Sequence, residues 1–106
     1  MHKKMAFLML LSLSSSVFAA NASLATVPSG WVLQNYVSDQ VYAFNTGSSC
    51  TNGELTLGSN ASDQDKNRFW SMIMAAKISK QKIMVYYEDS GAPNNCVITS
   101  FLLDKE

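Results

Sequence analysis

The stretch Arg68–Asp89, RFWSMIMAAKISKQKIMVYYED, decides the fold because its hydrophobic periodicity changes halfway along. Between Phe69 and Ala76 the apolar residues recur every three or four positions, which is the period of an amphipathic helix. Between Ile83 and Tyr87 isoleucine, valine and tyrosine occupy alternate positions, which is the period of a strand. The stretch therefore predicts a helix that is followed, after a short polar turn, by a strand.

The sequence on either side predicts four further strands, each bounded by turn-forming residues. Three precede the helix and one follows the strand at Ile83–Glu88: Trp31–Val37, Val41–Phe44, Glu54–Leu57 and Cys96–Leu103. The helix is expected to begin at Ser62 or Asp63 and to end at Ser79. Ser62 with Asp65 three residues later resembles a capping box, which supports that start.

The order of these elements is three strands, one helix and two strands. A five-stranded barrel of the OB type places its helix between strands three and four, where the helix covers one end of the barrel. The sequence therefore predicts a mainly β (α+β) domain with a five-stranded, OB-fold-like barrel. The alternative is a small open antiparallel sheet with one helix packed on its face.

The N-terminus has the pattern of a secretory signal peptide. A basic start at His2–Lys4 precedes the apolar run Met5–Leu13, and small residues then offer cleavage after Ala19 or Ala22. The apolar run is shorter than the roughly 20 residues that a membrane-spanning helix needs. We therefore expect residues 1–22 to be a signal peptide and residues 23–106 to form one secreted or periplasmic domain without a membrane span.

The chain contains two cysteines, Cys50 and Cys96. In an exported domain such a pair most often forms a disulfide, because the compartment is oxidising. A redox or nucleophilic role is disfavoured, since neither cysteine stands in a Cys-x-x-Cys pattern or beside a basic residue. We expect a Cys50–Cys96 disulfide.

The residues that remain disfavour catalysis, metal binding and nucleic-acid binding. The single histidine, His2, leaves with the signal peptide, so no Ser-His or Cys-His couple and no usual zinc ligand set is expected. Lys3 and Lys4 are two of the eight basic residues, so the mature chain also lacks the basic excess that nucleic-acid binding requires. We expect no catalytic residue, no metal site and no cofactor.

Binding is the remaining class of function, and the aromatic side chains suggest it. The mature chain is rich in flat, amphipathic rings that can stack on sugars or anchor a protein interface: Trp31, Tyr36, Tyr42, Trp70, Tyr86 and Tyr87. Trp70 is expected to fill the core from the helix, whereas Tyr87 stands at a strand end, where core and surface roles are both open.

The segment FWSMIMAAKISKQKIMVYYED resembles the receptor-binding B subunits of subtilase cytotoxin and of its pertussis-like and typhoid-toxin relatives. In that family an aromatic-rich helix leads through a polar turn into a strand that ends in two tyrosines and an acid. Upstream, SGWVLQNY resembles the start of the first strand of those subunits. The resemblance implies an OB-fold lectin that forms a homopentamer around a pore, associates with a separate toxic A subunit and binds host glycans, sialylated ones among them.

The same resemblance implies a binding site and an orientation for the helix. The sugar-contacting serine corresponds to Ser29 and the contacting tyrosine to Tyr87, whereas Ala25 stands in place of a further acidic contact. In a ring, Lys66 and Lys77 are expected to face the channel. Two other readings stay open at this point: a small periplasmic inhibitor of an envelope-directed hydrolase, and an exported enzyme.

Overall fold

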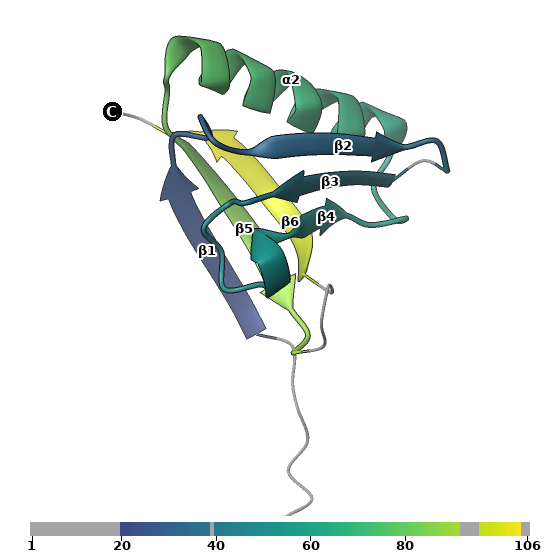
Figure 1. Cartoon of the computed structure of the whole chain (residues 1–106). Helices are drawn as coiled ribbons and strands as arrows, with labels where there is room; N and C mark the ends of the chain where they lie inside the picture. The colour runs from purple at the N-terminus through teal and green to yellow at the C-terminus, as the bar shows by residue number, and fades with distance from the viewer. Residues whose placement is uncertain (1–19, 39, 92–95, 105–106) are drawn as a thin grey trace, which may run out of the picture.

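The computed structural model describes residues 20–38, 40–91 and 96–104, which form six strands and one α-helix (Figure 1). The described part of the chain is a mainly β, α+β domain, as the sequence predicts. The strands are β1 (Ala20–Thr26), β2 (Val32–Tyr36), β3 (Gln40–Phe44), β4 (Leu55–Leu57), β5 (Ile83–Asp89) and β6 (Cys96–Leu103). The helix is α2 (Asp63–Ser79), and a 3₁₀ turn, η1, spans Thr51–Gly53.

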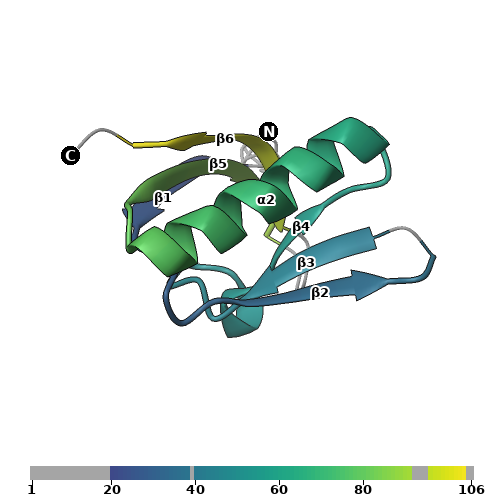
Figure 2. The same ribbon diagram turned by 90° about the horizontal axis from the view of Figure 1, so that it is seen from above.

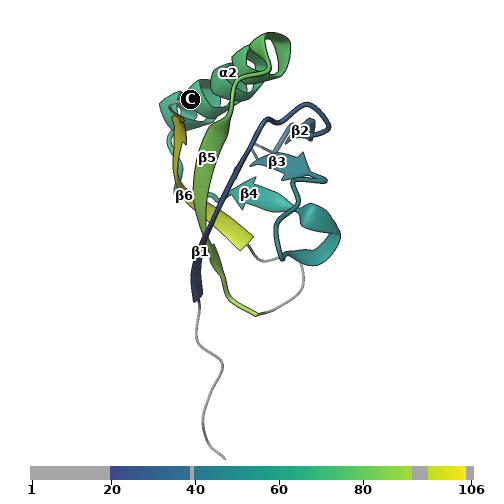
Figure 3. The same ribbon diagram turned by 90° about the vertical axis from the view of Figure 1, so that its left-hand side faces the viewer.

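The six strands form one mixed sheet in the order β1-β5-β6-β4-β3-β2. All neighbours are antiparallel except β4 and β6, which pair in parallel where Thr56 lies opposite Val97. Figure 1 shows the β1–β5–β6 half running steeply across the β2–β3–β4 half. Figure 3 shows these two halves facing each other beneath α2, so that the sheet is strongly curved.

The predicted five-stranded barrel is wrong in two respects. The sheet has six strands in the described residues, and no strand pairing joins its two edges, β1 and β2, so it is not closed. The chain crosses from one edge to the other through a turn in which the Trp31 N–H donates to the Pro28 carbonyl (3.2 Å). The alternative, an open antiparallel sheet with one helix on its face, is right about the open sheet and the single helix of the described residues, but the sheet is mixed because the β4–β6 pair is parallel.

The strand that the sequence analysis missed is β1. Its sequence, ANASLAT, consists mostly of alanine, serine and asparagine, which have low strand propensity, and pairing with β5 overrides that preference. Residues 1–19 lie outside the described residues, so the signal peptide stays a prediction. Because β1 begins at Ala20, cleavage after Ala19 leaves the strand whole, whereas cleavage after Ala22 removes three of its residues.

The helix has the predicted bounds and the predicted capping box. The Asp65 N–H donates to the Ser62 side chain (3.0 Å), and the Ser62 N–H donates to the Asp65 carboxylate (3.3 Å). The expectation that Lys66 faces a channel is wrong, because Lys66 is buried. The Lys77 ammonium donates to the carbonyl of Trp31, and its orientation in a ring stays a prediction. No helix within residues 20–38, 40–91 and 96–104 is long and apolar enough to cross a membrane.

The core lies between the two halves of the sheet and the inner face of α2. Phe69, Ile73 and Ala76 of the helix are completely buried. The Phe69 ring packs edge-on against Phe101 of β6, with ring centroids 5.2 Å apart. Figure 2 shows α2 running along the top of the β2–β3 hairpin and across the ends of the steeper strands. Both halves of the sheet therefore depend on this one helix for part of their burial.

Candidate functional site

Ser29, the first predicted glycan contact, lies on the exposed turn between β1 and β2. Its carbonyl accepts a hydrogen bond from the Lys77 ammonium (3.4 Å), which ties the turn to the C-terminal half of α2. The side chain of Ser29 is in contact with solvent, as a ligand contact requires.

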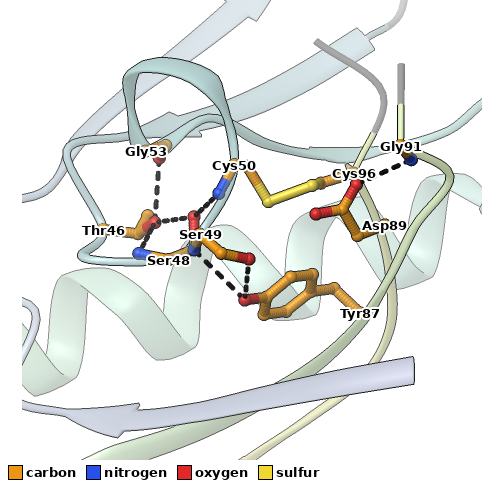
Figure 4. Close-up of a disulfide and its surroundings, with 9 residues drawn as sticks. All are labelled: Thr46, Ser48, Ser49, Cys50, Gly53, Tyr87, Asp89, Gly91 and Cys96. Carbon is orange, nitrogen blue, oxygen red and sulfur yellow. Dashed lines mark hydrogen bonds between the residues drawn. A yellow bond between two sulfur atoms is a disulfide. The ribbon is translucent and has the colours of Figure 1, made fainter. Parts of the chain in front are cut away.

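Tyr87, the second predicted contact, is part of the core and only 3% exposed. Its hydroxyl lies 3.4 Å from both the backbone nitrogen and the Oγ of Ser49 (Figure 4). The Ser49 N–H donates to the phenolic oxygen, so the hydroxyl is used to hold the 45–53 loop. The structure therefore gives Tyr87 a structural contact instead of an exposed ring.

The structure does not bring Ser29 and Tyr87 together. In the β1–β5 ladder Tyr87 lies opposite Ala22, whereas Thr26 lies opposite Ile83 at the other end of β5. Those two levels are separated by four residues of strand, or about 13 Å. Ser29 follows Thr26 and so lies beyond the far level. One small ligand cannot contact both side chains in this arrangement.

The predicted disulfide between Cys50 and Cys96 is present (Figure 4). It joins the 45–53 loop to the first residue of β6, and hydrogen bonds among the hydroxyls of that loop surround it. The Asp89 carboxylate completes a group of possible metal ligands with the two sulfur atoms, all within 4.8 Å of one another. Because the sulfur atoms are bonded to each other, neither is the thiolate that a metal needs.

A cluster of rings covers the outer face of the β2–β3 hairpin, and we call it the aromatic platform: Tyr36, Tyr42 and Phe44. It arises from strand alternation, because Val41 and Ala43 of β3 point into the core and the residues next to them point outward. The Tyr36 and Tyr42 ring centroids are 5.3 Å apart, edge to face. The Tyr42 and Phe44 rings are nearly parallel, with centroids 5.9 Å apart.

Two surface hollows adjoin the aromatic platform and share Phe44. One, of about 480 Å³, is lined by Tyr36, Ser38, Gln40, Tyr42, Phe44 and Glu54. The other, of about 680 Å³, continues toward the disulfide loop and is lined by Val32, Phe44, Asn45, Gly47, Ser48, Asn52 and Gly53. Their linings together combine the three rings of the aromatic platform with amide, hydroxyl and carboxylate groups.

The chemistry of this surface fits a polyhydroxylated ligand. The rings present flat apolar faces, and the side chains beside them both donate and accept hydrogen bonds. The Tyr42 hydroxyl already donates to the Gln40 amide oxygen (2.9 Å), which fixes the ring and leaves the amide N–H₂ available as a donor. No lysine or arginine is among the described residues that line the two hollows, so the surface lacks the cations that a phosphate backbone needs.

Sequence reasoning found part of this surface. It named Tyr36 and Tyr42 as rings able to stack on sugars, but it placed the site at Ser29 and Tyr87. Phe44 was missed as a platform residue. The available signal was the two-residue period of the predicted strand Val41–Phe44, which puts Tyr42 and Phe44 on the same face.

Comparison with known proteins does not add a relative to these observations. No protein-family model matches the chain, and no curated protein and no solved structure matches it. The function is therefore inferred from the geometry of the site and from the residues themselves.

Proposed function

We propose that this protein is an exported binding protein that recognises glycans on the aromatic platform. The observation that carries the proposal is the arrangement of Tyr36, Tyr42 and Phe44, three outward-facing rings on adjacent strands with the Gln40 amide beside them. Such rings cover the apolar faces of sugars, and neighbouring amides bind the hydroxyl groups. The proposal assigns binding and no catalytic step to this surface.

The strand order supports an OB-type ancestry for this binding protein. In an OB barrel the first strand pairs with both the second and the fourth. Here β1 and β2 follow each other in the chain. β1 pairs with β5, and β2 pairs with β3. Counting β1 and β2 as halves of one strand that is broken at Pro28 gives the OB order, with α2 between the third and fourth strands. This order agrees with the resemblance to toxin B subunits.

The charge of the platform favours a neutral part of the glycan as its ligand. Glu54 is the charged side chain among the residues that line the two hollows, so an acidic sugar placed there meets a like charge. A host glycan that carries a sialic acid can bind through its neutral sugars. The platform therefore predicts tolerance of sialylated and unsialylated glycans with the same core.

Loss of one platform ring should weaken glycan binding at least tenfold. The variant Tyr36→Ala removes a ring that is 45% exposed in the free protein and that a bound sugar would cover. A tenfold loss corresponds to about 1.4 kcal/mol. The matched control is Tyr86→Ala, which removes a comparably exposed tyrosine (41%) from β5, outside the platform.

A glycan array with both variants tests this expectation, once circular dichroism has shown that each variant is folded. Binding should be lost in Tyr36→Ala and retained in Tyr86→Ala. Equal binding by parent and Tyr36→Ala, or equal losses in both variants, would remove the platform from consideration. A parent protein that binds no glycan on the array would contradict the proposed function itself.

We further infer that copies associate into a ring, with five subunits as in the resembled family. Apolar side chains are exposed on α2 and at the end of β6, and an assembly would cover some of them: Met74, Ile78, Leu102 and Leu103. The Ile78 side chain, at 79% exposed, is the most accessible of these. A separate toxic A subunit is the partner that the resemblance implies for such a ring.

Light scattering at micromolar concentration should report about five copies of the parent protein, the number that the resemblance implies for a closed ring. Ile78→Glu should release monomers without unfolding them, because it places a charge in the contact while leaving the core intact. Lys80→Glu, an exposed change in charge just beyond the helix, serves as the control. A parent protein that is monomeric at all concentrations would rule out the ring.

That last outcome would favour the alternative function, a small inhibitor that binds an envelope-directed hydrolase. The observation behind it is β2, an edge strand that has no partner on one side among the described strands. Its Val32 and Tyr36 are exposed, and the fully exposed Val37 follows them. Such edges bind other proteins by strand addition. A monomer that inhibits a purified envelope hydrolase at stoichiometric ratio would establish this alternative.

A further inference from the structure

A second cleft lies on the other side of the β2–β3 hairpin, between the hairpin and the N-terminal half of α2. Its volume is about 530 Å³, and it is lined by Asn35, Val41, Asp63, Lys66, Asn67 and Trp70. The four helical residues stand at positions i, i+3, i+4 and i+7, so they form one stripe of α2. Figure 2 shows this half of the helix alongside β2 and β3.

The hairpin residues of the cleft face away from the aromatic platform. Asn35 and Val41 lie directly opposite each other in the β2–β3 ladder. Side chains alternate along a strand, so Asn35 points to the opposite face from Tyr36, and Val41 to the opposite face from Tyr42. The cleft is therefore a site of its own, and a ligand in it does not need the platform.

The polar groups of the cleft balance in charge. Asp63 carries a carboxylate and Lys66 an ammonium, and the amides of Asn35 and Asn67 each offer donors and acceptors. Lys66 is only 7% exposed, so its charged end is held in place by its surroundings and is not free to extend into solvent. An anionic ligand meets Asp63 and a cationic ligand meets Lys66, so a neutral ligand avoids both like-charge contacts.

The cleft also provides a flat apolar wall and is not an anion site of the helix terminus. Trp70 is half-buried, packed against the core on one side and open to the cleft on the other. At the start of the helix the Asp65 N–H is already bonded to the Ser62 side chain, and the Ser62 N–H to the Asp65 carboxylate. A ligand with both a hydrogen-bonding edge and an apolar face satisfies this lining.

From these groups we propose that the cleft binds a neutral pyranose sugar residue. The Trp70 ring covers the C–H face of the sugar, Asp63 accepts hydrogen bonds from its hydroxyls, and Asn35 and Asn67 bind the hydroxyls on its rim. The glycan-binding platform on the opposite face of the hairpin and this cleft then make two separate contacts per subunit, which raises avidity for branched or clustered glycans.

Indole N–H signals in a ¹⁵N-tryptophan sample test the cleft directly. Trp31 is 4% exposed and does not line the cleft, so its signal is an internal reference for Trp70. Titration with the methyl β-glycosides of glucose, galactose and N-acetylglucosamine should shift the Trp70 signal with at least one sugar and leave Trp31 in place. No shift with any of the three at 50 mM, or equal shifts of both signals, would overturn the proposal.

A pair of helix variants locates the effect. Asn67→Ala should raise the apparent Kd for the responding sugar about fivefold, the loss expected for a neutral hydrogen bond. Ser71→Ala, one turn further along and outside the cleft, should leave the Kd unchanged. A Kd unchanged in Asn67→Ala, or a Trp70 shift produced by inorganic phosphate in preference to the sugars, would contradict the assignment.

These experiments test the aromatic platform and the cleft independently of each other. Tyr36→Ala should lose glycan-array binding while its Trp70 signal still responds to the sugar, since Tyr36 does not line the cleft. A Trp70 response lost in Tyr36→Ala would mean that the cleft is not a separate site. A Trp70 response in a parent protein that binds nothing on the array would support the cleft and contradict the platform.

Discussion

The double variant Cys50→Ala/Cys96→Ala should lose about 4 kcal/mol of stability relative to the parent protein, on the chain-entropy estimate for a disulfide that closes a loop of 46 residues. A domain of this size is stable by roughly 5–15 kcal/mol, so the variant keeps only a small margin. The melting temperature should fall by about 15–30 °C. Thermal unfolding followed by circular dichroism measures the change.

Reduction provides the matched control for this variant. Dithiothreitol should lower the melting temperature of the parent to near that of the variant and should leave the variant unchanged, because the disulfide is the group that it cleaves. Thiol labelling of unreduced, denatured parent protein should find no free thiol. A variant that melts with the parent would show that the 45–53 loop and β6 hold together without the bond.

Phe69→Ala should cost about 3–5 kcal/mol, because it removes a large ring from a completely buried position. Phe69 lies where α2 meets β6, and its ring contacts Phe101 edge-on. The cavity left behind lies where α2 packs on β6, and the buried Ile73 and Ala76 of the same helix keep α2 on the core, so the cavity closes only in part. Urea unfolding gives the change in free energy.

Met74→Ala on the same helix is the control for Phe69→Ala. Met74 is 40% exposed in the single subunit, so truncating it should change the free energy of unfolding of the monomer by less than about 1 kcal/mol. Similar decreases in the free energy of unfolding for Phe69→Ala and Met74→Ala would mean that both faces of α2 are buried in the species that unfolds. In the proposed ring that outcome would depend on protein concentration, and in a monomer it would not.

The elements with strong periodicity were predictable from the sequence. The bounds of α2 were found from its apolar spacing and its Ser62–Asp65 cap, and β6 from the run of apolar residues after Cys96. β1 was not predicted because its alanine and serine residues have low strand propensity, and its strand conformation depends on pairing with β5. Closure of the sheet depends on pairing between distant segments, which a local pattern does not encode.

The candidate sites were predictable only in part, because a side chain can bind a ligand only where it is exposed, and exposure depends on contacts between segments that are distant in sequence. Tyr87 was an even choice between core and surface, and its contact with Ser49, far away in sequence, decides for the core. Lys66 was expected to face the channel of a ring, yet it is buried beside the β2–β3 hairpin. Trp70 was expected to fill the core, and it does so with one side while its other side lines the cleft.

The pairing of β1 with β5 sets the order in which the domain can be completed. The chain is synthesised from its N-terminus, so β1 is made early and has no partner until residues 83–89 follow it. Pairings between such distant segments form late. An unpaired apolar strand would be prone to aggregate during this delay. The alanine, serine and asparagine residues of β1 have little tendency to form such aggregates. The weak strand propensity of β1, which made the strand hard to predict, thus lowers the risk of aggregation before β5 is available for pairing.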